Sequence, residues 1–178
     1  MKNSFLWNSM IRGYACNGFS LKSLVMCREM LNFGQKPDNF TYLFVLKACG
    51  DILIRGIGRK VHALVLVGGF ESNIHLVNSL LLMYFTFGEL AIVRLLFDKM
   101  SLRDLTSWNT VIYGYVKNGE PNDAFLVFDH MRRASGIGDR TTLLALLFAC
   151  SDLMDSKLIS VDIICCVPSA TKRYHAPH

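Results

Sequence analysis

The chain repeats itself at a fixed distance of 101 residues. Residues 7–14 read Trp-Asn-Ser-Met-Ile-Arg-Gly-Tyr, and residues 108–115 read Trp-Asn-Thr-Val-Ile-Tyr-Gly-Tyr. Between positions 7 and 51, 15 of 45 residues are identical to the residue 101 positions later, which is too regular for chance. A compact enzyme has no need for such a period. The repeat therefore predicts stacked units that share a continuous core and present an extended surface.

The long period divides into shorter units of 35, 35 and 31 residues. The third unit supports this division. Its Asn78, Gly88 and Met100 align with Asn8, Gly18 and Met30 of the first unit. We place units at residues 4–38, 39–73, 74–104, 105–139 and, in part, 140–158. Residues 159–178 match no unit, so the last unit loses its second half. We expect these residues to form a poorly ordered tail.

Each unit is predicted to form two short helices. Trp7, Met10, Ile11 and Tyr14 follow the spacing i, i+3, i+4, i+7 of one helical face, and equivalent residues recur in the third and fourth units. Asn-Gly pairs, which tolerate the left-handed conformation, are expected to end the first helices. The pattern predicts an all-α fold.

The hydrophobic content is high for a chain without a membrane segment. Hydrophobic residues make up 52% of the chain, and the mean hydropathy is +0.32. A single helical hairpin cannot bury its apolar face alone, so stacking explains this composition. The apolar runs are too short to cross a bilayer. We therefore expect no membrane partner.

The net charge and the cysteine spacing exclude few classes of function. Lys and Arg exceed Asp and Glu by 19 − 14 = 5, which is compatible with a polyanionic partner but does not establish one. The six cysteines show no CxxC spacing, and Cys165 and Cys166 are adjacent, so we expect reduced thiols and no metal site. Residues 56–60 are glycine-rich but lack the spacing of a nucleotide-binding loop. We expect no cofactor.

The units resemble pentatricopeptide repeats, and their lengths resemble the P, L and S triplet of the plant subclass of that family. Unit one, with Trp7-Asn8 and Pro37-Asp38, resembles a P repeat, as does unit four. The second unit and the partial fifth unit resemble L repeats, and the third unit resembles an S repeat. The resemblance covers residues 4–158. It implies a right-handed α-solenoid that binds single-stranded RNA, one base per repeat.

The same resemblance assigns base choice to two residues in each repeat. These are the residue after the first-helix aromatic and the last residue of the repeat, and the pairs here are Asn8 with Asp38, Asn78 with Asp104, and Asn109 with Asp139. The family pattern links an Asn–Asp pair to uracil, and an amide offers both a donor and an acceptor to a base. The equivalent residues in the L-like units are Leu43 and Leu144, which cannot hydrogen-bond. The expected site is U-any-U-U.

Two weaker assignments accompany this code. The family's base-stacking position, three residues before the specificity residue, is occupied by Phe5, Phe40, His75 and Thr106. A stacking role and a gap-filling role remain equally open for the two phenylalanines. Lys117 is the one residue that matches the family's phosphate-contacting lysine, because Cys16, Asp51 and Thr86 occupy the other equivalent positions.

The expected function is RNA binding in C-to-U editing, splicing or stabilisation of mitochondrial or chloroplast transcripts, with organellar processing factors as expected partners. The H-x-E and P-C-x-x-C motifs of zinc deaminases are absent, so we expect no catalysis in this chain. Because residues 1–4 run directly into the first unit, we also expect no presequence in it. A monomer is expected. The alternatives are a protein-binding scaffold of the tetratricopeptide type and a non-functional remnant of a longer protein.

Overall fold

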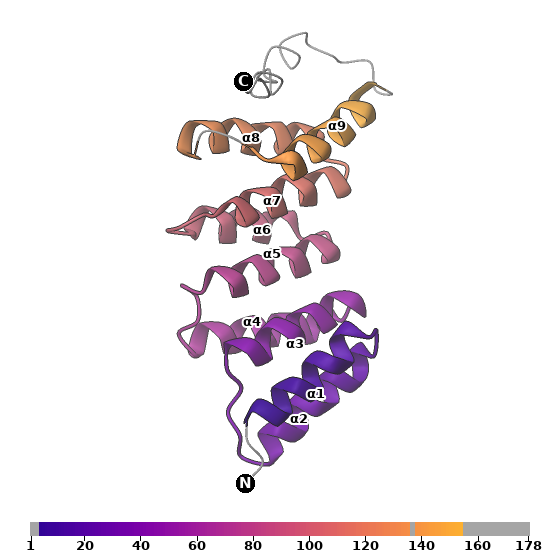
Figure 1. Ribbon diagram of the computed structural model, residues 1–178, viewed down its shortest axis with the longest axis vertical. Helices are drawn as coiled ribbons and strands as arrows, with labels where there is room; N and C mark the ends of the chain where they lie inside the picture. The colour runs from indigo at the N-terminus through magenta and orange to yellow at the C-terminus, as the bar shows by residue number, and fades with distance from the viewer. Residues whose placement is uncertain (1–3, 136–137, 155–178) are drawn as a thin grey trace, which may run out of the picture.

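The computed structural model of the protein describes residues 4–135 and 138–154, and in this part every regular element is an α-helix. The helices are α1 (Ser4–Cys16), α2 (Ser20–Asn32), α3 (Asn39–Asp51), α4 (Arg55–Val67), α5 (Ile74–Phe87), α6 (Leu90–Lys99), α7 (Leu105–Lys117), α8 (Pro121–Ser135) and α9 (Arg140–Met154). They form antiparallel pairs that stack along the long axis of the molecule (Figure 1). The predicted helical-repeat solenoid is confirmed, and its handedness stays a prediction. The expected loss of the second helix of the fifth unit, and the tail at residues 159–178, concern residues outside the described part of the chain.

The last residue of each unit caps the first helix of the next. Asp38, Asn73 and Asp104 are the N-cap residues of α3, α5 and α7, and each side chain accepts a hydrogen bond from the backbone N–H three residues later. Asp139 accepts in the same way from the N–H of Thr142. Each cap satisfies a helix-terminal donor that would otherwise lack a partner. The repeat period, with spacings of 35, 31 and 35 residues between successive caps, thus places a polar side chain at each junction between units.

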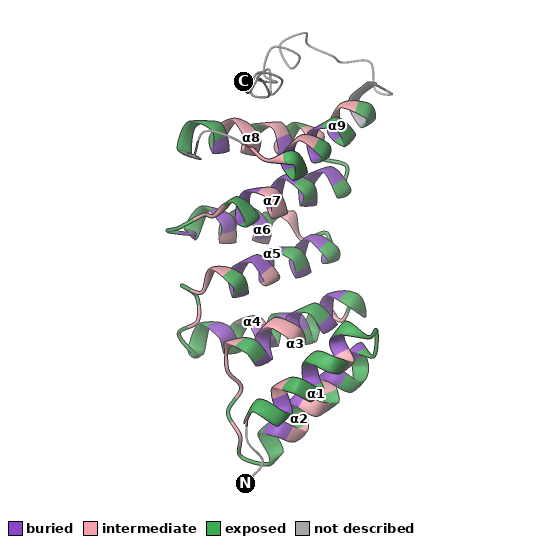
Figure 2. Ribbon diagram, in the orientation of Figure 1, coloured by how far each residue is buried: buried purple, intermediate pink, exposed green. Residues whose placement is uncertain are grey.

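The helices form two layers with the core between them. The first helices of successive units pack on one another, α1 on α3, α3 on α5, α5 on α7 and α7 on α9, whereas the second helices pack mainly on first helices. Buried faces turn inward between the layers (Figure 2). One hydrophobic cluster runs from Trp7 to Ala149 through all five units. The expected continuous core is therefore confirmed, and no described helix is long and apolar enough to cross a bilayer.

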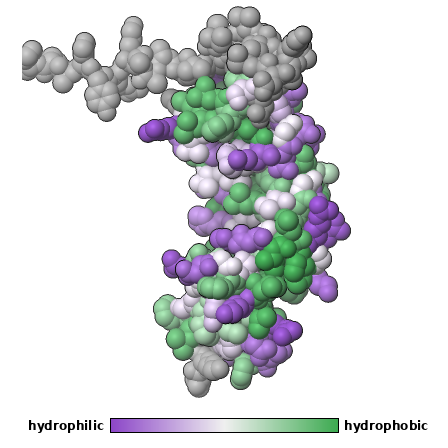
Figure 3. All heavy atoms as spheres, turned by 90° about the vertical axis from the view of Figure 1, so that its right-hand side faces the viewer, coloured by the Kyte–Doolittle hydropathy of each residue, from purple (hydrophilic) through white to green (hydrophobic). Residues whose placement is uncertain are grey.

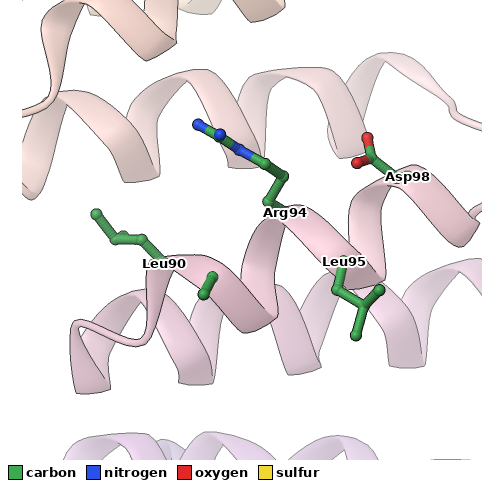
Figure 4. A pocket seen from close by; sticks show the side chains of 5 residues that line it. Leu90, Arg94, Leu95 and Asp98 are labelled. Atoms are coloured by element: carbon green, nitrogen blue, oxygen red, sulfur yellow. The ribbon is translucent and has the colours of Figure 1, made fainter.

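Polar contacts link the second-helix layer from unit to unit. Arg59 of α4 pairs with Glu89 before α6 at 2.9 Å, and Arg94 of α6 pairs with Asp123 of α8 at 2.7 Å. A shallow hollow of about 500 Å³ lies over the outer face of α6. Its lining includes Arg94 and Asp98, which point to one side of α6, and Leu95, which points to the other (Figure 4). The Arg94 guanidinium in this lining already pairs with Asp123, so it is not free to hold an anionic ligand.

The thiols in the core are unreactive. Cys27 and Cys49 are buried, and burial raises their pKa values to about 11 and about 12. The thiolate is the reactive form of cysteine, and at neutral pH these groups stay protonated. All four cysteines in the described part of the chain are free thiols, and Cys16 is exposed. No metal-binding group of His, Cys, Asp or Glu occurs within the same residues.

The turn between the two helices of a unit uses a left-handed residue. Gly18, Gly88 and Gly119 occupy this position with φ values of 78°, 72° and 73°. The Asn-Gly pairs predicted this for Gly18 and Gly119, and the repeat register placed Gly88 at the same position. In unit two the same position is Leu53, with φ of 55° and an exposed fraction of 60%. A left-handed conformation costs an L-residue other than glycine about 1–2 kcal/mol. Hydrophobic surface gathers on this side of the molecule, where the turns lie (Figure 3).

Replacing Leu53 by glycine should stabilise the protein. The strain of about 1–2 kcal/mol is relieved, and the extra freedom of glycine in the unfolded chain costs about 0.4–1 kcal/mol. We expect a net gain of about 0.5–1 kcal/mol in the free energy of unfolding, measured by urea denaturation. Gly119→Leu is the matched control, because open space surrounds Gly119 and only its backbone conformation resists a side chain. The Gly119→Leu variant should have a lower free energy of unfolding than the wild type. Equal free energies of unfolding for both variants and the wild type would show that the left-handed backbone is not strained by leucine.

Candidate nucleic-acid interface

The fifth residues of the first helices form a row. Because α1, α3, α5, α7 and α9 each begin at the first residue of a unit, the residues in this row are Asn8, Leu43, Asn78, Asn109 and Leu144. The N-terminal ends of the first helices lie along one side of the stack (Figure 1). The row therefore lies on one side, next to the caps that end each unit.

Asn8 is held between two units. Its Nδ2 donates to both carboxylate oxygens of Asp38, at 3.1 and 2.9 Å. Its Oδ1 accepts from the hydroxyl of Thr41 at 2.6 Å. The carboxylate that caps α3 thus also fixes the amide on α1, and the amide is half-buried at the surface. One N–H direction and one oxygen lone pair remain for an external ligand.

Asn109 repeats this arrangement in unit four. Its Nδ2 donates to Asp139 Oδ1 at 3.0 Å, and its Oδ1 accepts from Thr142 at 2.5 Å. The backbone N–H of Thr142, followed by the amide of Asn109 and the Thr142 hydroxyl, lowers the pKa of Asp139 against the opposing effect of partial burial. The carboxylate therefore stays charged and acts only as an acceptor. Two predicted pairs, three units apart in the chain, share one geometry.

Asn78 departs from the expectation of three equivalent pairs. Its exposed fraction is 6%, and neither its Nδ2 nor its Oδ1 has a hydrogen-bond partner among the described residues. The expected partner Asp104 is engaged by Ser107, whose backbone N–H and hydroxyl both donate to Asp104 Oδ1 at 2.7 Å. Burial would raise the pKa of Asp104, but these hydrogen bonds outweigh it and the pKa is lowered. The side-chain amide of Asn78 lies near enough to Asp104 to lower this pKa as well, although the two side chains do not meet the geometry of a hydrogen bond.

The second unit has no pair of this kind. Leu43 is half-buried, and Asn73 uses its side-chain oxygen to cap α5 at the N–H of Leu76, 3.1 Å away. A hollow of about 390 Å³ opens here between α3 and α5. Its lining includes Leu43, Lys47 and Leu82. An apolar side chain at the row position can contact a base but cannot select one by hydrogen bonding.

The expected stacking residues are all exposed beside the row. Exposed fractions are 70% for Phe5 and 58% for Phe40, and His75 and Thr106 are also exposed. Phenylalanines at such exposure do not fill gaps in a core, which weighs against the gap-filling alternative. Phe5 nevertheless has an interaction within the protein.

Sequence reasoning missed two of the cations on this face. Arg12 and Lys47 lie one helical turn after the row positions of α1 and α3, and both are exposed. The Arg12 guanidinium lies 5.8 Å from the centre of the Phe44 ring, and Lys47 pairs with Asp51 at 2.8 Å. Lys117, the predicted phosphate contact, is exposed and lies 5.5 Å from the Tyr113 ring. The i+4 spacing from the row residue was the signal that could have found the first two.

A model of the pentatricopeptide repeat family matches residues 5–35 and 106–135, the two units with fixed Asn–Asp pairs. Curated relatives from Arabidopsis thaliana match most of the chain. The chain belongs to the pentatricopeptide repeat family. Pentatricopeptide repeat-containing protein At4g21065 is 38% identical over 85% of this chain and 26% of its own length, and At5g16860 is 41% identical over 83% and 17%.

A third relative, At1g15510, is named chloroplastic and is 39% identical over 88% of this chain and 18% of its length. The chain thus spans about a quarter or less of the pentatricopeptide repeat proteins that it resembles. The crystal structure of maize PPR10 matches with a TM-score of 0.48 at 17% identity, over 88% of this chain and 29% of that one.

Proposed function

We propose that the array binds single-stranded RNA along the row of fifth residues and selects uracil at units one and four. The observation that carries this proposal is the shared geometry of the Asn8–Asp38 and Asn109–Asp139 pairs. A carboxylate can only accept, so it holds each amide with Nδ2 on its own side. The remaining N–H and lone pair then have defined directions, as a hydrogen-bonding reader of a base edge requires.

The residues around the row suit a flexible polyanion. Exposed Phe5, Phe40 and His75 offer rings for stacking, which is worth about 1–3 kcal/mol per base. Arg12, Lys47 and Lys117 offer positive charge one or two turns further along the first helices. Phosphate contacts of this kind make binding weaken with added salt. The P, L and S types of the units, as proposed from their lengths, fit the alternation of reading and non-reading positions.

The proposed site is U-any-U-U, with the third base read least well. Asn78, which faces that base, is buried and lacks the partners that fix its two counterparts. Three stacked or paired bases at about 1–3 kcal/mol each supply about 3–9 kcal/mol, which is at best comparable to an association cost of about 4–15 kcal/mol. We therefore propose weak binding by this chain alone, and tighter binding when further repeats extend the row.

The cellular role that we propose is organellar RNA processing without catalysis by this chain. Two relatives carry the words chloroplastic and mitochondrial in their names. Editing, splicing and transcript stabilisation all need a protein that marks one site on one transcript. An array that reads three bases supplies part of that mark, and processing factors that recognise the bound complex would supply the chemistry.

Fluorescence anisotropy at low salt tests the proposal. A labelled 12-nucleotide RNA with a U-A-U-U centre in an oligo-A background should bind about 10-fold more tightly than oligo-A, the equivalent of one good reading contact at about 1–3 kcal/mol. Asp139→Ala should reduce this preference to about 3-fold or less. Asp129→Ala is the matched control: it removes the same charge from the outer helix α8, where Asp129 pairs with Arg133, and should keep the preference.

Two outcomes would contradict the proposal. Oligo-A that competes as well as the U-A-U-U RNA would remove base selection. Absence of RNA binding, together with specific capture of a peptide in the hollow between α3 and α5, would favour the protein-binding scaffold.

A further inference from the structure

The two fixed asparagines share a third partner that lies on the next unit. Thr41 and Thr142 each occupy the third position after the capping aspartate, and both are fully buried. Each hydroxyl oxygen accepts from the aspartate backbone N–H at 3.1 Å. Its single hydrogen then has two acceptors in reach. The threonine Oγ1 lies 2.6 Å from Asn8 Oδ1 and 2.5 Å from Asn109 Oδ1, closer than the 3.0 Å to Asp38 Oδ1 and Asp139 Oδ1, so the hydroxyl donates mainly to the asparagine.

Unit three shows what happens when this partner changes. Ser107 occupies the threonine position, and its hydroxyl donates to the Asp104 carboxylate at 2.7 Å. The oxygen of Asn78 therefore receives no donor. Asn78 is the one row asparagine without partners in the described structure, and it is also the buried one.

The difference between the two side chains has a physical cause. A β-branched threonine has restricted χ1 rotation, and in units one and four its hydroxyl is held by the reciprocal capping box with the aspartate. The hydroxyl therefore points back toward the preceding unit. Serine lacks the methyl group that restricts rotation, so its hydroxyl is free to turn to the nearest carboxylate.

We infer that Thr41 and Thr142 are positioning residues that decide whether the asparagine of the preceding unit reads a base. The inference rests on the proposed function and deepens it, because the reading group becomes a triad of Asn, Asp and Thr spread over two units. The threonine donates to Oδ1 while the aspartate accepts from Nδ2. Turning the amide over would place its oxygen against the carboxylate and its nitrogen against the threonine.

A locked amide discriminates between pyrimidines. Uracil carries an acceptor oxygen at position 4, whereas cytosine carries an amino donor there. An amide fixed by the triad presents one pattern of donor and acceptor, and an amide that can turn presents both. Loss of the hydroxyl therefore lowers the preference for one pyrimidine over the other, while leaving the stacking surface and the cations unchanged.

Thr142→Val and Ser107→Thr test the inference in opposite directions. Valine keeps the shape of threonine and removes the hydroxyl. Dissociation constants are compared for RNAs with U or C opposite unit four and opposite unit three. We expect the wild-type protein to prefer U by about 10-fold at unit four and the Thr142→Val variant by 2-fold or less. Ser107→Thr should raise the preference at unit three by about 3-fold or more.

Two measurements separate this inference from the proposed function. Thr142→Ser is the control that keeps a hydroxyl without the methyl group, and it should give an intermediate preference. NMR of the Asn109 side-chain amide reports the lock without RNA: its two protons should be well separated in the wild type and converge in Thr142→Val. Full U preference or unchanged amide signals in Thr142→Val would overturn the inference. Wild-type protein with separated amide signals but no base preference would instead overturn the proposed function.

Discussion

Replacing Trp108 by alanine is expected to lower the free energy of unfolding by about 3–5 kcal/mol. Trp108 is 4% exposed and belongs to the core that joins units three and four. Its ring meets Phe97 of α6 edge-on at 5.1 Å. The guanidinium of Arg103 lies 5.6 Å from the Trp108 ring and donates to the Phe97 carbonyl at 2.8 Å. Alanine would leave a cavity at the junction between the second helix of one unit and the first helix of the next.

Urea denaturation followed by circular dichroism measures this effect, because the substitution removes a fluorescent probe. Tyr113→Ala is the matched control on the same helix. Its ring is 44% exposed, and we expect a change of about 0.5 kcal/mol or less. A loss below 1 kcal/mol in Trp108→Ala would mean that the two units do not share one core.

Most of the fold could be predicted because the period of the sequence and the period of the structure have the same cause. Apolar residues at helical spacing had to face a neighbour, and polar or glycine residues at fixed intervals had to end the helices. The first helices accordingly begin at the residues where the units begin. The left-handed conformation of Leu53 was not predicted, because leucine does not favour it. It is imposed by the turn geometry that this unit shares with the others.

Only part of the candidate site could be predicted from the sequence. Recurrence placed each asparagine in register with the aspartate that ends its own unit, and in units one and four the two side chains form a hydrogen bond. It could not reveal how deeply Asn78 is buried, since burial depends on the packing of α5 between two other units. The recurring hydroxyl at Thr41, Ser107 and Thr142 was visible in the sequence. Its role emerges only from the direction in which each hydroxyl points.

The repeated Gly-Tyr at the end of the first-helix motif leads to the second large expected effect. A Cβ atom added at Gly114 would lie 2.3 Å from the Phe85 ring of α5, too close for any real contact. Phe85 is 5% exposed and also packs edge-on against Tyr115 at 5.3 Å, so it has little room to move. Gly114→Ala should therefore push α7 away from α5 and lower the free energy of unfolding by about 1–3 kcal/mol.

Gly13 provides a matched control in the same motif. It occupies the equivalent position on α1, where an added Cβ meets nothing within 4 Å. Gly13→Ala removes only the poor helix propensity of glycine and should raise stability by up to about 1 kcal/mol. Thermal and urea unfolding of the two variants would give shifts of opposite sign. Shifts of the same sign would show that helix propensity, and not the approach of one unit to the next, explains glycine at this position.

Since α5 and α7 carry the reading residues of units three and four, Gly114→Ala should also weaken RNA binding, whereas Gly13→Ala should leave it unchanged.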